Sequence, residues 1–408
     1  MGNKVVIIGA GPSGLMAACS AAELGKSVTV IEKMPRPCRK LMITGKGRCN
    51  LTNNCDLDGL IKSMTKNGRF LYSAFSAFSS SDTMSFFETA GVPLKTERGN
   101  RVFPVSDKSV DIVDAIVSRA KKLGVRIIND TVRMVAVKDG RAAGVCCEDG
   151  NYDADSVIIA TGGKSYPLTG STGDGYGIAA SLGHSVTELT PSLVPIITRE
   201  EWCSSLQGLS LKNVSVSFYE NDKKKAVYTD FGEMMFTHFG VTGPMILSAS
   251  AHLRKNSGAG YRMEIDLKPA LDDSVLDKRL LGDLAENSNR DIINALEKLL
   301  PKRLIPVVIS QAGIDRSLKA NQLSKENRTA LLHNLKHLTA TTSGFRPIEE
   351  AIVTSGGVKV SEINPATMES KLVSGLYFAG EIIDVDAYTG GFNLQIAFST
   401  GYVAGRNA

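Results

Sequence analysis

Three glycines near the start of the chain have the spacing of a phosphate-binding turn. They form the pattern Gly9-x-Gly11-x-x-Gly14, and Glu32 follows Gly11 after 21 positions. In such a turn the first glycine permits a tight bend, the second admits a pyrophosphate to bare backbone, and the third allows close helix packing. A carboxylate at the end of the next strand accepts hydrogen bonds from ribose hydroxyls and disfavours a 2′-phosphate. These residues predict binding of a dinucleotide, either FAD or NAD.

The segments around these glycines predict a strand, a helix and a second strand. Lys4 to Ala10 is a β-branched apolar run of strand length, as expected of a strand buried on both faces. Gly14 to Leu24 has the small and straight-chain residues of a helix, and Gly25 suits its left-handed end. Ser27 to Glu32 returns to strand composition. The helix N-terminus, preceded by Ser13 in the turn, presents free amides and roughly +0.5 charge to phosphates.

Length, charge and cysteine content set the broad class of the protein. The 408 residues predict two domains, or one domain with an insertion. The net charge is +5, with basic and acidic residues mixed along the chain, so we expect no nucleic-acid partner. Seven cysteines without a C-x-x-C pair favour neither a disulfide framework nor a zinc site, and indicate the cytoplasm. Glycine and proline break the apolar start, so we expect neither a signal peptide nor a membrane span.

A glycine-rich basic segment follows the acid-bearing strand. It runs from Arg39 to Asn53 with the sequence RKLMITGKGRCNLTN, which is unsuited to a helix or a central strand. Placed beside that strand, it can offer backbone amides and basic donors to phosphates and to an isoalloxazine ring. An ordinary polar surface loop is the alternative interpretation.

Four segments in the same order resemble one family of bacterial flavoproteins. They are RKLMITGKGRCNLTN, ATGGKSYPLTGSTGDGYGIAASLGH from Ala160, GEMMFTHFGVTGPMIL from Gly232, and TSGGVKVSEINPATMESKLVSGLYFAGEIIDVDAYTGGFNLQIAFSTGYVAG from Thr354. They are similar to the BaiN/aminoacetone-oxidase-like family of NAD(P)/FAD-dependent oxidoreductases. Membership implies FAD as the cofactor, in a two-lobed fold.

The resemblance and the local patterns together nominate the cofactor-binding residues. Val132 resembles the position at which relatives hold the adenine, and Thr161 and Gly162 form a glycine turn where a buried strand ends. The family's flavin contacts fall near the C-terminus. Beyond the opening turn and Glu32, the expected contacts are Lys33, Arg39, Lys40, Gly47, Arg48, Asn50, Val132, Thr161, Gly162, Gly380, Glu381, Asn393, Leu394 and Gln395.

Strand patterns at both ends of the chain predict a discontinuous nucleotide-binding lobe. Asp155 to Ala160 and Gly375 to Ala379 have buried-strand composition, and a helix follows over Ile396 to Ala404. We expect an α/β fold in which a Rossmann-type FAD lobe comprises residues 1–190 and 345–408. An inserted lobe, 191–344, would hold a sheet or barrel over about 191–270 and helices over about 275–340.

Few residues stand out as catalysts. His238 lies in a family segment, and histidine is a residue type suited to proton transfer, although an apolar turn more often holds a structural histidine. Tyr388, beside the Gly390-Gly391 turn, is a candidate proton donor or an aromatic wall of the pocket. No His, Asp or Glu grouping has metal spacing, so we expect no metal.

The resemblance implies three alternative functions. The first is reduction of a carbon–carbon double bond conjugated to a ketone in a small apolar substrate, such as a 3-dehydro bile acid or 3-oxo steroid, with NAD(P)H as the electron source. The second is oxidation of a small amine such as aminoacetone by O₂. The third, of another class, is a non-redox or RNA-modifying flavin-binding protein. We lean to the first, in steroid and lipid metabolism.

Overall fold

The protein folds into two compact units. The computed structural model describes residues 3–220, 223–253 and 255–408. Unit 1 comprises Met1–Ser192 and Pro347–Ala408, and unit 2 comprises Leu193–Arg346. Unit 2 is therefore an insertion in the chain of unit 1.

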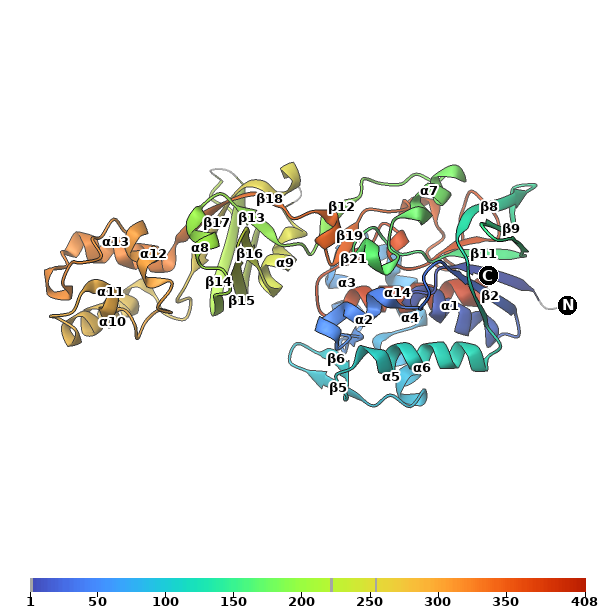
Figure 1. Ribbon diagram of the computed structural model, residues 1–408, viewed down its shortest axis with the longest axis horizontal. Helices are drawn as coiled ribbons and strands as arrows, with labels where there is room; N and C mark the ends of the chain where they lie inside the picture. The colour runs from blue at the N-terminus through green and yellow to red at the C-terminus, as the bar shows by residue number, and fades with distance from the viewer. Residues whose placement is uncertain (1–2, 221–222, 254) are drawn as a thin grey trace. The chain divides into compact units, whose positions relative to one another are not determined.

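A five-stranded parallel sheet forms the centre of unit 1 (Figure 1). Its order is β20 (Leu376–Phe378), β11 (Ser156–Ile159), β1 (Lys4–Ile8), β2 (Ser27–Glu32) and β7 (Arg126–Asn129). Ile7 of β1 lies in register with Val30 of β2 and Ile158 of β11. Because both faces of the sheet are covered, the four strands β20, β11, β1 and β2 consist mostly of buried apolar residues, whereas no residue of the edge strand β7 is fully buried.

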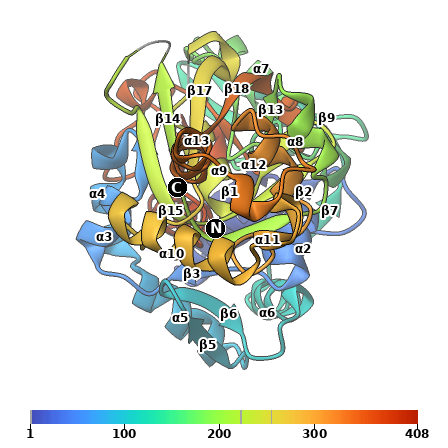
Figure 2. The same ribbon diagram turned by 90° about the vertical axis from the view of Figure 1, so that its left-hand side faces the viewer.

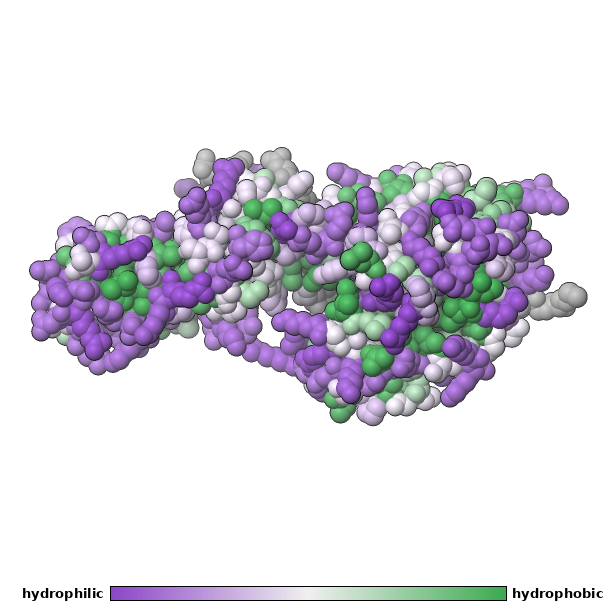
Figure 3. Space-filling view, viewed as in Figure 1, coloured by the Kyte–Doolittle hydropathy of each residue, from purple (hydrophilic) through white to green (hydrophobic). Residues whose placement is uncertain are grey.

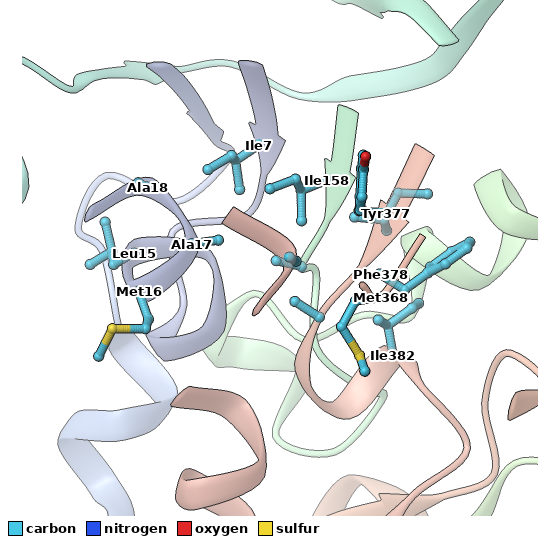
Figure 4. Packing of buried hydrophobic residues seen from close by; sticks show 14 of the residues in the cluster. Ile7, Leu15, Met16, Ala17, Ala18, Ile158, Met368, Tyr377, Phe378 and Ile382 are labelled. Atoms are coloured by element: carbon cyan, nitrogen blue, oxygen red, sulfur yellow. The ribbon is translucent and has the colours of Figure 1, made fainter. Parts of the chain in front are cut away.

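The two ends of the chain meet on this sheet. Helix α1 (Pro12–Ala22) packs against the C-terminal helix α14 (Phe392–Asn407). A Cβ at Gly401 would lie 2.3 Å from the carbonyl oxygen of Ser13, and one at Gly405 would lie 2.2 Å from that of Ala17. Only glycine permits so close an approach. Figure 4 shows Leu15 and Met16 of α1 within the same buried cluster as Ile158 and Phe378 of the sheet.

The remaining elements of unit 1 surround the sheet. The helices are α2 (Arg39–Ile43), α3 (Leu57–Lys62), α4 (Tyr72–Ala77), α5 (Ser80–Thr89), α6 (Ser109–Lys122) and α7 (Asp174–Ser181). The small strands are β3 (Thr52–Asn53), β4 (Met64–Lys66), β5 (Leu94–Glu97), β6 (Arg101–Pro104), β8 (Val132–Lys138), β9 (Arg141–Cys147), β10 (Asn151–Asp153), β12 (Thr190–Ser192), β19 (Val353–Ser355) and β21 (Asp386–Ala387).

One local expectation is wrong. The Arg39–Asn53 segment is not entirely irregular, because α2 occupies its first five residues. Cys38 precedes this helix in the left-handed conformation, with φ of 57°, and buried Leu41 anchors the helix in the core. The helix is a single turn stabilised by tertiary packing, which composition alone does not reveal.

Unit 2 combines a barrel with a helical part. Figure 2 shows the long strands β14 and β15 side by side. In closed order the strands are β13 (Ile196–Thr198), β16 (Gly240–Thr242), β15 (Tyr228–Thr237), β14 (Ser210–Glu220), β17 (Ala259–Asp266) and β18 (Leu338–Phe345). Its helices are α8 (Glu201–Ser205), α9 (Pro244–Ser250), α10 (Asp273–Glu286), α11 (Ile292–Ala295), α12 (Ile305–Gln311) and α13 (Lys325–Lys336). The expected fold class, a Rossmann-type lobe with an inserted sheet or barrel and helices, is confirmed.

Candidate functional site

The turn after β1 has the geometry that its glycines predict. Gly9 adopts φ of +101°, and a Cβ on it would lie 2.7 Å from the carbonyl oxygen of Ala160. A Cβ at Gly14 would lie 2.0 Å from the carbonyl oxygen of Gly9, whereas one at Gly11 meets no protein atom within 4 Å. The backbone at Gly11 is therefore open to a ligand. In the described chain no side chain caps α1, so the amides of its first turn can bind an anion.

A cavity opens beside this turn at the carboxyl ends of β1, β2 and β11. It is open to solvent on one side and comprises about 1030 Å³ that protein atoms do not fill, part of it open solvent. Eleven of the expected cofactor contacts line it, and they come from both ends of the chain. These are Gly9, Gly11, Ser13, Glu32, Arg39, Lys40, Thr161, Gly162, Glu381, Asn393 and Leu394.

A second, smaller cavity of about 450 Å³ adjoins the first. The two share four lining residues, Gly9, Glu32, Thr161 and Gly170, so they form one continuous site. Among the expected contacts, Lys33 and Val132 line the second cavity. Its other walls include Ile8, Ile31 and Ile178, and these apolar side chains suit a flat aromatic base such as adenine.

Glu32 lies where the two cavities join. Its Oε2 accepts a hydrogen bond from the Ala10 amide at 2.7 Å, and its Oε1 accepts one from the Met34 amide at 2.9 Å. Each carboxylate oxygen has a second lone pair for a ligand donor. The two amides thus fix the carboxylate where a ribose between a diphosphate and a base would lie.

Basic side chains outnumber acidic ones on the wall of the first cavity, whereas Lys33 shares the wall of the second with Glu32, Asp130 and Asp174. Arg36, Arg39 and Lys40 line the first cavity, next to the N-terminus of α1. In the second, the Lys33 ammonium pairs with Asp174 and Thr172. Cations combined with free helix amides are well suited to the two phosphates of a dinucleotide.

An ion pair closes another part of the first cavity. Lys40 Nζ donates to the two oxygens of Glu381 at 3.1 and 2.8 Å and to Ser165 Oγ at 2.7 Å. Glu381 Oε1 also accepts the Thr354 amide at 2.7 Å. A Cβ at Gly163 would come within 2.8 Å of Glu381 Oε1. The glycine turn after β11 therefore leaves room for this carboxylate.

The first turn of α14 presents Asn393 and Leu394 to the first cavity. Asn393 Oδ1 accepts the Ala387 amide at 3.0 Å, and Asn393 Nδ2 donates to the Ala387 carbonyl at 2.8 Å. This pair of hydrogen bonds ties the first turn of α14 to β21. The side chain of Asn393 thus fixes the backbone beside the cavity.

Six expected contacts line neither cavity, and the structure gives them other roles. Gly14 and Gly380 (φ +79°) permit close packing around α1. Gln395 is fully buried, and its amide bonds with Thr52, Thr83, Ser399 and the Phe78 carbonyl. Asn50, in the amide orientation that suits its neighbours, accepts from the Gly391 amide at 3.0 Å. Gly47 adopts φ of +84° in the turn that precedes Arg48.

Arg48 shows why a basic residue in this loop need not face the cavity. Its guanidinium pairs with Glu97 and with Asp107, and stacks over the Phe103 ring at 4.1 Å. The hydrogen bond from Arg48 is the main cause that lowers the pKa of Glu97. Arg48 therefore fastens its loop to β5 and β6.

The two candidate catalysts line neither cavity. Tyr388 is partly buried against the core of unit 1, and its amide donates to the Ser63 carbonyl at 3.0 Å. His238 lies exposed in the turn between β15 and β16 of unit 2, with its ring edge-on to Phe239 at 4.9 Å. Catalysis by either residue stays a prediction.

Several cavity residues were not anticipated from the sequence. Arg36 and Cys38 lie in the segment directly after Glu32. Their closeness in sequence to the acid-bearing strand could have indicated that they line the site. Ile352, Val353 and Val385 also line the first cavity. These three flank the C-terminal family segment or lie within it, but apolar residues carry no chemical signal of a site.

Two further properties concern the described residues only. Within residues 3–220, 223–253 and 255–408, no three His, Cys, Asp or Glu side chains gather as metal ligands would. In the same ranges, every helix is too short or too polar to cross a lipid bilayer.

Comparison with known proteins covers nearly the whole chain. The family model described as HI0933-like protein Rossmann domain matches residues 3–407. The chain is 30% identical over 411 residues to a 3-dehydro-bile acid delta(4,6)-reductase of Clostridium scindens, covering 100% of this chain and 99% of the relative. It is 31% identical over 407 residues to a ribosomal RNA dihydrouridine synthase of Haemophilus influenzae, covering 98% and 97%.

A solved structure shares the fold at lower identity. This structure is a 3-ketosteroid delta1-dehydrogenase from Sterolibacterium denitrificans in complex with 1,4-androstadiene-3,17-dione. The match has a TM-score of 0.52 and 14% identity, and it covers 99% of each chain.

Proposed function

Because this chain belongs to the HI0933-like Rossmann family and is an FAD-dependent oxidoreductase, we propose that it reduces a carbon–carbon double bond conjugated to a carbonyl group. The observation that carries the proposal is a chemical feature common to two full-length relatives. A delta(4,6)-reductase of a 3-dehydro bile acid saturates double bonds conjugated to the 3-oxo group. A dihydrouridine synthase saturates the C5–C6 bond of uracil, which is conjugated to the C4 carbonyl.

The residues of unit 1 suit FAD on structural grounds. The uncapped start of α1 and the open backbone at Gly11 would receive the diphosphate, and Glu32 would accept ribose hydroxyls. The second cavity would hold the adenine beside Val132. Bound FAD supplies the hydride chemistry. Leu394, Val385 and Ile352 would exclude water from the remaining part of the first cavity.

A 3-oxo steroid or 3-dehydro bile acid is the first candidate substrate. The C. scindens relative covers the whole chain, and the apolar walls of the first cavity are compatible with an apolar reactant near the flavin. A reductase needs an external electron donor, and NAD(P)H is the donor that the resemblance implies. We include NAD(P)H in the proposal on that basis.

A uracil base in ribosomal RNA is the second candidate substrate, and the charge distribution favours it. Unit 2 contains 21 Lys and Arg against 17 Asp and Glu, so it carries four of the five net positive charges. Residues 287–325 alone contain seven basic and three acidic side chains. Figure 3 shows a largely hydrophilic surface over the helical part of unit 2.

The basic segment 287–325 folds back on itself. The Ala320 amide donates to the Arg290 carbonyl at 2.9 Å, and Lys319 pairs with Asp291 at 2.7 Å. Arg290, Lys319 and the residues next to them are thus neighbours in space. Such a local excess of positive charge is the usual feature of a surface that binds phosphates of nucleic acid.

An anaerobic experiment tests the reaction and separates the substrates. Purified protein with bound FAD is mixed with NADH or NADPH, and loss of the flavin absorbance is followed. The reduced protein is then divided between a 4-en-3-oxo steroid, a ribosomal RNA transcript and buffer. Reoxidation by one substrate, with the saturated product detected by mass spectrometry, supports the proposal and identifies the class. Flavin that neither nicotinamide reduces, but that aminoacetone bleaches, would instead identify an amine oxidase.

A further inference from the structure

The ion pair of Lys40 and Glu381 is built as a fixed unit in the cavity wall. Both side chains keep only 20% of their surface exposed, and 341 positions separate the two residues in the chain. Besides its bonds to Glu381, the ammonium of Lys40 contacts Ser165, which is completely buried. A charge pair that is mostly buried is screened less than a fully exposed pair, so its charges act on a neighbouring ligand.

Several backbone groups hold this pair in one orientation. The Thr354 amide donates to Glu381 Oε1 at 2.7 Å, and the Lys164 amide donates to Thr354 Oγ1 at 2.8 Å. The absence of a side chain at Gly163 gives the carboxylate its space. The glycine turn after β11 and strand β19 therefore position Glu381, and Glu381 positions Lys40.

The arrangement of the two cavities places this pair outside the adenine end of the site. The second cavity and the residues it shares with the first mark the adenine and ribose end of the site. Lys40 and Glu381 line only the first cavity, together with Leu394, Val385 and Ile352. Because the adenine end lies at the second cavity, the pair borders the part of the site that is left for the diphosphate and the isoalloxazine ring.

We propose that Lys40 and Glu381 set the reduction potential of the bound flavin through opposing charges. This inference rests on the proposed function only in taking FAD as the bound group. Reduction adds electrons, and therefore negative charge, to the isoalloxazine system. The Lys40 ammonium favours that charge and the Glu381 carboxylate opposes it. Glu381 is a positioning residue for Lys40, and its negative charge also limits the effect of the Lys40 ammonium on the reduction potential.

Opposing charges predict shifts of opposite sign, which distinguish this role from a merely structural one. Lys40→Met leaves the carboxylate uncompensated, so reduction becomes less favourable and the potential falls. Glu381→Gln leaves the ammonium uncompensated, so the potential rises. The double variant restores neutrality and returns the potential towards that of the unaltered protein. Lys40→Arg keeps the charge and leaves the potential nearly unchanged.

The measurement is the midpoint potential of FAD in each purified protein, obtained by slow chemical reduction against a reference dye. We expect each single charge removal to change the equilibrium constant for reduction at least tenfold, which is about 30 mV for a two-electron couple. Lys33→Met is the matched control, because Lys33 also pairs with a carboxylate but lines only the second cavity. It is expected to weaken FAD binding while shifting the potential less than Lys40→Met.

Shifts of the same sign for Lys40→Met and Glu381→Gln, or an equal shift from Lys33→Met, overturn the inference. If Lys40→Met fails to retain FAD, Glu381→Gln and Lys40→Arg decide the question, since the first must raise the potential and the second must preserve it. Chemical reduction needs no nicotinamide and no substrate. The midpoint potentials therefore stay interpretable if the protein shows no reductase activity. Conversely, if the potentials do not shift as expected, the reductase activity is still decided by the anaerobic assay.

Discussion

The two units of this protein can be compared by the space around their glycines. In unit 1, glycines such as Gly14 and Gly401 lie where a single added carbon would enter the van der Waals radius of a backbone oxygen. In unit 2, Gly282 of α10 and Gly313 after α12 face open space. Both cavities described above lie in unit 1. The close approaches at Gly14 and Gly401 thus border the cofactor site, whereas the close approach of Gly240 to the Ile196 carbonyl in unit 2 lies between two barrel strands.

Matched glycine substitutions give the largest contrast between the units. Gly14→Ala would place Cβ against the Gly9 carbonyl, so the turn must open and we expect loss of bound FAD. Gly282→Ala, in the exposed interior of α10, should stabilise the protein by about 0.5–1 kcal/mol through helix propensity. Flavin absorbance per protein measures the effect of Gly14→Ala, and the thermal midpoint measures the effect of Gly282→Ala. Retention of full flavin content in Gly14→Ala contradicts the steric account.

Removal of a carboxylate from each unit compares the two units in a second way. Glu32→Ala leaves the amides of Ala10 and Met34 without their acceptor and removes the ribose contact. We expect FAD affinity to fall at least about tenfold, since each lost acceptor costs about 1–3 kcal/mol. Titration of the apoprotein with FAD measures the change. Glu233→Ala, on the exposed side of β15, is the control and should bind FAD normally.

Charge reversal in unit 2 tests whether the insertion contacts nucleic acid. Replacing Arg290, Arg316 and Lys325 by Glu should weaken binding to a ribosomal RNA transcript and flatten its salt dependence by about one unit of slope per lost phosphate contact. Gel-shift titrations at several salt concentrations measure this. Reversal of Lys223, Lys224 and Lys225, in the loop between β14 and β15, changes the net charge equally and should matter less. Equal losses from both triple variants exclude a specific surface, and weak binding by the unaltered protein removes the RNA candidate.

A smaller effect concerns acid stability in unit 1. Buried His184 contacts Glu362 at 3.2 Å through Nδ1 and Ser370 at 2.9 Å through Nε2, and burial is the main cause that lowers its pKa. The unfolded chain therefore binds this proton more readily than the folded protein. Stability contributed by neutral His184 is present above about pH 6.5 and is lost as pH falls below it.

Thermal unfolding at pH 7.5 and pH 5.5 measures this dependence. His184→Gln should reduce the difference between the two midpoints. His238→Gln, an exposed change in unit 2, should leave the difference as it is in the unaltered protein. An unchanged difference in His184→Gln contradicts a role for this histidine.

Much of the fold could be predicted because the sequence patterns that indicate it each span only a few residues. The apolar run before Gly9 and the acid at Glu32 define a strand, a helix and a strand within 33 residues. The structure places Gly11 and Glu32 on the cavity wall, as those spacings lead one to expect. Helix α2 could not be predicted, because its five residues are helical only where Leu41 packs into the core.

The sequence alone determined the nucleotide turn, since glycine conformation and strand periodicity depend on residues a few positions apart. It also nominated basic and amide side chains as cofactor ligands, but it did not determine the direction in which they point. Only the tertiary structure decided that Arg48 turns to Glu97, that Gln395 enters the core, and that Lys40 meets Glu381. The physical reason is that pairing across hundreds of positions depends on how every intervening element packs, which no local pattern contains.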